Sequence, residues 1–545
     1  MNSEMGSHWK KGEICGVDNC RSRLYTVDEN DGYQYCENGH RRGNTLVIGE
    51  DEDQFNPHAK RLRKKSTDET EKTYQYFKGR EAFDLYLQCY QLILRHQIWF
   101  MVHSKGLPAE LENIIFDLWA LRISTLKDRI DDASGDESQS QMFSSASEGE
   151  TDHDGEAPRL GRRGRKVNDT PKLIDTLALC YLGTLTLRLP VTLGDLHDWV
   201  TEGDMVYIRA IKSIPVPMKE RLPSAYHSSL DPNSTLKFER LHTAVLDLVV
   251  SYRRDCGAEF PPLNHPLLLY RYMKRLALPL EVYPAVTKLA RLLGYTFTYR
   301  LELTNKRARI TDIPEAQLIS LIIVSVKLFY PFDDVRRYPS MVTEPAAAVI
   351  DWDAWKDATS KFRKTLEVPD KMKAGELMAV KEKDVFSMSG SQMDQYLDWY
   401  QRTWTDESVR EQDKDSDFRT ALFREFPVGP NDEQRSTSPA AISEKAIQEA
   451  ETERLKVVLS KLKARAVITE EEAQDQGDIK RPGSQYKYFR KESDLPDNAK
   501  MFYEEAAKIS GLSMKMLVKA VFLTEMKIQR RSDERRKEKR RREEL

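Results

Sequence analysis

Hydrophobic residues recur at spacings of three and four along much of the chain, a period that predicts amphipathic helices. The first two helices are expected around residues 83–100 and 108–122. The pattern resumes at Thr170, a good N-cap with Pro171 at the first helical position, and Thr192 caps the following helix. These segments predict a first helical block.

A second helical block repeats the same period. Its first apolar stripe runs over Phe238–Tyr252, and further helices are expected at Leu267–Leu278 and Val282–Leu293, the latter closed by Gly294. Leu318–Phe329 is the most apolar segment of the chain. It is too short to cross a membrane, so it is expected to be a central core helix.

The C-terminal third has a weaker pattern. Aromatic residues suggest further packed helices there: Trp352, Trp355, Phe362, Tyr396, Trp399, Tyr400 and Trp404. A polar helix is expected over 441–465, and a last amphipathic helix from about Asn498 to Lys527 that passes into a basic tail. The predicted fold class is therefore mainly α.

Two stretches hold too few apolar residues to fold alone. Residues 44–72 form a charge-mixed strip that serves either as a plain tether or as a functional strip that orders on a partner. Residues 131–168 interrupt the first block with an acidic run followed by the basic octamer Arg159–Lys166. The octamer fits a nuclear import signal, a phosphate or minor-groove contact, or a solvated hinge, and the hinge is favoured because charge runs are usually solvated.

Composition agrees with globular domains joined by solvated linkers. The length of 545 residues suits about three or four domains, and 32% of the residues are charged. The formal net charge is −2, so any nucleic-acid affinity must come from local patches. The sequence has neither an apolar leader nor a long apolar run, so secretion and membrane spanning are not expected.

The cysteines do not form a disulfide pattern, which suits a reducing compartment. Cys89, Cys180 and Cys256 lie within or at the end of apolar helical patterns and are expected to be buried thiols. His197 has no partner at metal spacing and is expected to be a surface or half-buried side chain.

Four residues near the N-terminus have the spacing of a metal site. Cys15, Cys20, Cys36 and His40 spell C-x4-C, fifteen residues, then C-x3-H. Thiolate and neutral imidazole are ligands of tetrahedral Zn²⁺, and four of them leave no open position, so one structural zinc ion is predicted. Two β-branched and aromatic runs around a turn at Gly32 separate the pairs, which predicts a small β zinc ribbon.

Basic residues form three candidate nucleic-acid contacts. The octamer supplies the first group, Arg162, Arg163, Arg165 and Lys166. Lys487 and Arg490 lie in Tyr486–Arg490, which suits base stacking and phosphate contact or, equally, an edge segment packed on a neighbour. From Lys527 onward the sequence has ten basic and five acidic residues. Arg540 and Arg541 in this tail can neutralise phosphates or serve nuclear import.

The sequence carries none of the common catalytic motifs. It has no phosphate-binding P-loop, no dinucleotide fingerprint, no nucleophile elbow and no H-E-x-x-H. An enzyme is therefore not expected.

Several segments carry a family resemblance: Cys15–Cys20, Gly32–His40, Leu193–Trp199, Pro314–Ile319, Lys327–Asp333 and Arg481–Ser484. With the order of ribbon, strip and two helical blocks, the chain resembles the TFIIB-like transcription factors. Among these it is most similar to the fungal RNA polymerase I-specific core-factor subunit and to the corresponding TBP-associated factor of the animal selectivity complex. The implied domains are a zinc ribbon at 8–43, a reader-like strip at 44–72, two cyclin-like five-helix folds at 73–230 and 231–365, and a helical C-terminal region at 366–545.

The resemblance implies an initiation factor that does no chemistry. Its ribbon would dock on RNA polymerase I, its strip would enter the cleft, and its cyclin folds would straddle promoter DNA and contact core-factor subunits and the TATA-binding protein. The implied location is the nucleus and nucleolus. The wide first knuckle and the terminal His40 depart from the polymerase II pattern and fit the polymerase I branch. A TFIIB-like factor for another polymerase and a cyclin-type regulator of a kinase are the alternatives.

Overall fold

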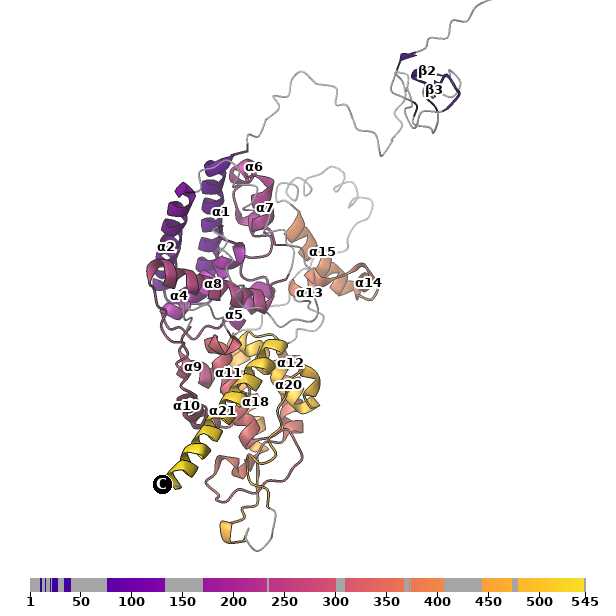
Figure 1. Ribbon diagram of the computed structural model, residues 1–545. Helices are drawn as coiled ribbons and strands as arrows, with labels where there is room; N and C mark the ends of the chain where they lie inside the picture. Colours follow the sequence, from indigo (N-terminus) through magenta and orange to yellow (C-terminus); the bar gives the residue numbers. More distant parts are fainter. Residues whose placement is uncertain are drawn as a thin grey trace, which may run out of the picture. The chain divides into compact units, whose positions relative to one another are not determined.

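The computed structural model describes residues 10–11, 15, 20, 22–27, 34–40, 76–132, 170–232, 235–299, 309–366, 372, 374–405, 444–472 and 479–543. The chain divides into two units, residues 1–73 and residues 74–545 (Figure 1). The predicted strip at 44–72 lies outside the described residues, as does the predicted insertion from residue 133 onward.

Three short antiparallel strands make up the regular structure described in the N-terminal unit. They are β1 (Lys10–Lys11), β2 (Leu24–Val27) and β3 (Gln34–Cys36), hydrogen-bonded in the order β1-β2-β3. The register places Tyr25 opposite both Lys10 and Cys36. Tyr25 is buried with the cysteines, so the hairpin turns its apolar side toward them. The predicted small β fold is confirmed.

The first helical block of the second unit is built around α4 (Leu173–Thr186). This helix is buried along most of its length and packs against α1 (Gly79–Trp99), α2 (Glu110–Asp132) and α8 (Phe238–Cys256). Shorter elements complete the block: the π-helix η1 (Phe100–Ser104), α5 (Leu193–Thr201), the 3-10 helix η2 (Ala210–Ser213), α6 (Val216–Arg221) and α7 (Ser224–Leu230). The sequence pattern placed the α8 stripe at the start of the second block, whereas α8 packs chiefly on α4.

The second helical block surrounds α11 (Pro314–Phe329), which is buried from Pro314 to Lys327 as expected of a central core helix. Among the elements that pack directly on it are α10 (Val282–Leu293), η3 (Ile310–Asp312), α20 (Asp497–Ser510) and α21 (Met514–Glu543). A further three helices pack on these or on one another: α9 (His265–Arg275), α12 (Trp352–Leu366) and α18 (Glu444–Ser460). Three of the seven, α18, α20 and α21, come from the C-terminal third. The C-terminal third therefore contributes to the core of this block.

Minor elements join this block. The strands β4 (Ala348–Val349) and β5 (Lys463–Ala464) pair antiparallel, and η4 (Pro345–Ala347) and η6 (Glu492–Asp494) are single 3-10 turns. Among the helices that the structure describes, none is long and apolar enough to cross a membrane.

The aromatic residues of the C-terminal third fall into two sets. Trp352 packs on Phe332, and both Trp352 and Trp355 pack on Phe502. The indole N–H of Trp355 donates to the Leu276 carbonyl at 2.8 Å. The second set lies on α15 (Gly390–Trp404), which follows α13 (Ala374–Ala379) and α14 (Glu382–Val385). No side chain of α15 is buried, so only the first set belongs to the core.

Two helix boundaries differ from the prediction. The first helix after the insertion begins at Leu173 rather than beside Thr170, because the Asp175 carboxylate accepts the Lys172 N–H at 2.9 Å and caps the helix there. The last predicted helix is two helices, α20 and α21, because Gly511 ends α20 with a φ of 67°. The Thr192 cap and the Gly294 terminus are confirmed.

The cysteine and histidine predictions have mixed outcomes. Cys89 and Cys180 are buried thiols, but Cys256 is exposed because it lies at the C-terminal end of α8. His197 is half-buried, which was one of the two predicted outcomes, with its Nε2 at 2.9 Å from the Leu236 carbonyl and its ring stacked on Phe238.

Candidate metal centre and nucleic-acid contacts

Backbone turns bring the four predicted metal ligands together. Cys36 ends β3, and its N–H donates to the His40 carbonyl at 3.0 Å across a turn in which Gly39 adopts a φ of 79°. A left-handed φ favours glycine, because it has no Cβ to clash. In the first knuckle, the Cys15 N–H donates to the Ser22 carbonyl at 3.0 Å. Local hydrogen bonds thus shape both knuckles.

The ligand atoms form a cluster of the right size for a metal ion. The Sγ atoms of Cys15, Cys20 and Cys36 and the ring nitrogen of His40 all lie within 4.8 Å of one another. Cys20 Sγ is 3.9 Å from Cys36 Sγ, and His40 Nδ1 is 3.6 Å from Cys36 Sγ and 3.9 Å from Cys15 Sγ. A tetrahedral zinc site with Zn–S of about 2.3 Å and Zn–N of about 2.0 Å separates its ligands by about 3.5 to 3.8 Å. The cluster therefore fits a tetrahedral ion.

The surroundings of the cluster favour the thiolate form. The Asn38 side chain donates to Cys20 Sγ at 3.3 Å, and the His40 N–H donates to Cys36 Sγ at 3.4 Å. Hydrogen bonding to the Ser22 backbone, followed by that of Asn38, lowers the pKa of the Cys20 thiol to about 6 against the smaller effect of burial. Thiolate is the form that binds metal, so the lowered pKa reduces the free energy needed to deprotonate Cys20 when a metal binds.

The structure describes two of the three predicted groups of basic contacts. The octamer residues lie outside the described part of the chain: Arg162, Arg163, Arg165 and Lys166. Arg540 and Arg541 are exposed near the end of α21, and Lys487 and Arg490 are exposed on the segment before η6. Nucleic-acid contact by any of these groups stays a prediction.

The segment that contains Lys487 is packed through its aromatic side chains. The Tyr486 hydroxyl donates to the Glu525 carboxylate on α21 at 2.6 Å, and Phe489 is buried. Lys327 Nζ, from α11, lies 4.5 Å and 4.3 Å from the centroids of these two rings and 2.5 Å from the same carboxylate. Of the two open interpretations, the packed edge segment is the one observed for Tyr486 and Phe489, which leaves the neighbouring cations to face solvent.

A partly buried ionic network joins the two helical blocks, and sequence reasoning missed it. The Asp195 carboxylate of α5 accepts hydrogen bonds from both terminal guanidinium nitrogens of Arg271 on α9, the one from Nη1 at 2.7 Å. Arg275 lies 3.8 Å from Asp195 and 3.3 Å from Glu451 on α18. Although burial opposes ionisation, the Arg271 charge keeps the pKa of Asp195 below its usual range. Asp195 lies in one of the segments that carried the family resemblance, but nothing in the sequence pairs it with Arg271.

A second missed contact brings two glycines together. A Cβ at Gly511 would lie 2.3 Å from the Gly194 nitrogen, and a Cβ at Gly194 would lie 2.9 Å from the Gly511 nitrogen. The Gly511 carbonyl lies 2.7 Å from Nε2 of the buried His242 on α8. Backbone from α5 therefore meets the turn between α20 and α21 without intervening side chains.

Acid is expected to destabilise this junction through His242. The side chain is 1% exposed, and burial lowers its pKa to about 4, against about 6.5 in an unfolded chain. The unfolded state therefore binds a proton that the folded state does not, so this stability is fully present above pH 6.5 and is lost as the pH falls toward 4. The loss at pH 5 is about 2 kcal/mol of unfolding free energy.

Urea unfolding of the wild-type protein and of His242→Gln at pH 7 and pH 5 measures this effect. The glutamine amide does not titrate but can still donate to the Gly511 carbonyl, so the variant is expected to show a pH dependence smaller by about 2 kcal/mol. Equal pH dependence in the two proteins would contradict the assignment.

Comparison with known families decides the relationship of the chain. The model of the Rrn7/TAF1B N-terminal cyclin domain matches residues 90–216, and that of the Rrn7/TAF1B C-terminal cyclin domain matches residues 234–404. The chain belongs to the Rrn7/TAF1B family. The tandem cyclin folds expected from the sequence are confirmed, and the predicted boundaries at 73, 230 and 365 stay predictions.

Relatives of this Rrn7/TAF1B-family chain include proteins from yeasts and vertebrates. The RNA polymerase I-specific transcription initiation factor rrn7 of Schizosaccharomyces pombe is 25% identical over 74% of this chain and 78% of the yeast protein. A TATA box-binding protein-associated factor for RNA polymerase I from Danio rerio is 30% identical over 32% of this chain and 31% of that protein. The Saccharomyces cerevisiae core factor crystal structure contains a chain with 15% identity and a TM-score of 0.45, covering 85% of this chain and 99% of that one.

Proposed function

We propose that this chain is an RNA polymerase I initiation factor that bridges the polymerase and the ribosomal DNA core promoter within a core-factor complex. The observation that carries the proposal is the Cys/His cluster followed in order by two Rrn7/TAF1B cyclin domains. Relatives that match most of the helical region are named as RNA polymerase I-specific initiation factors. The factor acts by placement and does no chemistry itself.

The cluster supports one structural Zn²⁺ ion. Cys15, Cys20, Cys36 and His40 would hold it, and because four protein ligands complete a tetrahedron, no position is left for substrate. The ion would supply a cross-link that small zinc modules need in order to fold. The folded ribbon then presents a fixed surface for the polymerase.

The other parts of the chain have roles consistent with this proposal. The cyclin folds contact promoter DNA, the TATA-binding protein and the other core-factor subunits, and the strip at 44–72 acts in the polymerase cleft. The factor works in the nucleus, in the nucleolus where ribosomal DNA is transcribed. The partly buried network around Asp195 supports this arrangement, because it holds the two helical blocks together.

Binding to purified RNA polymerases I, II and III, with promoter DNA and TATA-binding protein added in turn, tests the proposal. We expect stable binding to polymerase I. Binding to polymerase II or III without binding to polymerase I would contradict the proposal and indicate a TFIIB-like factor for another polymerase. Binding to a kinase alone would favour a cyclin-type regulator.

The basic end of α21 is expected to contribute salt-dependent DNA affinity. Replacing Arg540 and Arg541 together by glutamine should lower the slope of log affinity against log salt by about 2, since each phosphate contact contributes about one unit. Fluorescence anisotropy with a core-promoter duplex at several salt concentrations measures the slope. The exposed pair Lys288 and Arg291 on α10, replaced in the same way, is the matched control. An equal slope in the wild-type protein and both variants would show that Arg540 and Arg541 do not contact phosphates.

A further inference from the structure

The two helical blocks meet at a buried carboxyl group that the proposed function does not use. Glu315 lies in the first turn of α11, the central helix of the second block, and is 0% exposed. The Tyr181 hydroxyl, from the central helix α4 of the first block, donates to its Oε1. The Tyr299 hydroxyl lies 3.4 Å from Oε2 of Glu315 and 3.4 Å from the Tyr181 hydroxyl. The three side chains therefore form a closed triangle of contacts between the blocks.

This triangle needs one more proton than the tyrosines supply. Each phenol carries one proton, whereas an ionised carboxylate accepts hydrogen bonds and donates none. Two protons fill two of the three contacts, and the third contact would then bring two oxygen atoms together without a hydrogen between them. A proton on Oε2 completes the set, because Glu315 then donates to Tyr299, Tyr299 donates to Tyr181, and Tyr181 donates to Oε1.

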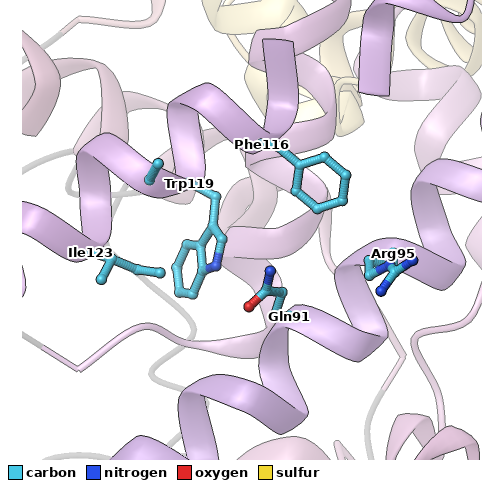
Figure 2. A pocket seen from close by; sticks show the side chains of 6 residues that line it. Gln91, Arg95, Phe116, Trp119 and Ile123 are labelled. Atoms are coloured by element: carbon cyan, nitrogen blue, oxygen red, sulfur yellow. The ribbon is translucent and has the colours of Figure 1, made fainter. Parts of the chain in front are cut away.

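Bulk water does not reach Glu315 to supply the missing donor. Gln91 and Arg95 illustrate the opposite case, because they face an open hollow of about 460 Å³ between α1 and α2 (Figure 2). Glu315 lines neither this hollow nor the one of about 650 Å³ beside Tyr486. A carboxylate at this position would lose its hydration without gaining solvent contact elsewhere, which is costly for a charge.

No cation offsets a negative charge at this position. Among the residues that the structure describes, none forms an ion pair with Glu315. The cations of α10, Lys288 and Arg291, are exposed. Other charged groups on the surrounding elements have partners of their own: Arg271 and Arg275 of α9 with Asp195 of α5, Lys327 of α11 with Glu525 of α21, Arg363 of α12 with Glu505 of α20, and Asp312 of η3 with the Arg309 N–H.

We infer that Glu315 is a neutral carboxylic acid in the folded protein and that its proton closes a clasp, formed by Glu315, Tyr181 and Tyr299, between the two helical blocks. When the clasp opens, the O–H bond at Oε2 breaks, its electron pair stays on the carboxylate, and the proton goes to water. The clasp is therefore a pH-dependent joint.

The electrostatics of the site give the sign of this dependence. Burial raises the pKa of Glu315, against hydrogen bonds from Tyr181, from its own backbone N–H and from Tyr299 that favour the ionised form. Burial and, after it, Glu315 raise the pKa of Tyr272 on α9, so this phenol stays neutral. Because the pKa of Glu315 in the folded protein lies above its unfolded value of about 4.3, the stability from the clasp is fully present below that pH. It is lost as the pH rises through the pKa of the folded state.

Urea unfolding of the wild-type protein and of Glu315→Gln between about pH 5 and pH 8 tests this inference. Glutamine accepts at its carbonyl and donates at its amide, so it reproduces the neutral acid without titrating. We expect the folding equilibrium constant of the wild type, divided by that of the variant, to fall by up to about tenfold per pH unit until the pKa of the folded state is passed. The division cancels the groups that both proteins share, His242 included. A ratio that stays constant over this range would overturn the inference.

Infrared spectroscopy detects the proton directly. The spectrum of the folded wild type minus that of Glu315→Gln at pH 7 should contain the carbonyl band of a carboxylic acid, and carboxylate bands in its place would contradict the inference. If the glutamine variant does not fold, Tyr299→Phe takes its place in the comparison. This change removes the acceptor of the inferred proton, so it should shift the carboxylic acid band, and an unshifted band would be evidence against the clasp.

Glu505→Gln is the matched control. Glu505 on α20 is only 9% exposed, but its carboxylate pairs with Arg363. Its difference spectrum should contain carboxylate bands and no carboxylic acid band, and a carboxylic acid band there as well would refute the link to the missing cation. None of these measurements uses a polymerase or DNA, so their failure would leave the proposed initiation function untouched.

Discussion

Replacing Cys36 by serine is expected to abolish the proposed zinc binding and unfold the N-terminal ribbon, while the helical unit keeps its structure. Cys36 contacts two other ligands, with its Sγ 3.9 Å from Cys20 Sγ and 3.6 Å from His40 Nδ1. Serine is a poor zinc ligand, and metal binding of about 10 kcal/mol or more is coupled to the folding of small zinc modules. The helical unit is separate in the structure, so its thermal unfolding should not change.

Elemental analysis for zinc and a pull-down with RNA polymerase I measure the two consequences. We expect bound zinc to fall close to zero and polymerase binding to be lost with it. Cys256→Ser is the matched control, because that thiol is exposed at the end of α8 and belongs to no cluster among the described residues. Unchanged zinc in Cys36→Ser would show that the ligand set is wrong, and lost zinc with intact polymerase binding would remove the docking role.

Replacing Gly511 by alanine is expected to lower the unfolding free energy of the helical unit by about 2 to 4 kcal/mol. Alanine at a φ of 67° costs about 1 kcal/mol by itself. Its Cβ would also lie 2.3 Å from the Gly194 nitrogen, and backbone on both sides must move to make room, which adds about 1 to 3 kcal/mol.

Gly257→Ala separates the two contributions. Gly257 ends α8 with a φ of 63°, close to that of Gly511, but a Cβ there meets nothing within 4 Å. Urea unfolding of both variants should give a loss of about 1 kcal/mol for Gly257→Ala and a clearly larger loss for Gly511→Ala. Similar losses would mean that the backbone at Gly194 and Gly511 moves apart at little cost in free energy, so that their close contact contributes little to stability.

Features that depend on neighbouring residues could be predicted from the sequence. The helix at Val282–Leu293 has the predicted bounds, because the apolar period and the terminal Gly294 both lie within one short segment. The metal cluster was predicted for the same reason, since the spacing within each knuckle specifies which ligands share one turn. Joining the two knuckles required only a hairpin.

Features that depend on distant residues could not be predicted. Tyr486 and Phe489 fitted two interpretations until α11 and α21 placed Lys327 and Glu525 beside them. The position of Asp195 in a recognisable segment gave no indication of Arg271, and a lone glycine at 511 did not suggest Gly194. Such pairings follow from the packing of whole helices, and the periodicity of a single segment carries no information about its partner.

The packing of α21 on α11 has a consequence for the order in which the chain is made. The most apolar helix, Pro314–Phe329, leaves the ribosome long before Met514–Glu543, yet the late helix supplies Thr524 to Ser320 and Glu525 to Lys327. A nascent chain, or one ended early by a premature stop codon, would hold α11 without this cover. The core of the second helical block therefore cannot be completed until the residues around Glu525 have been synthesised.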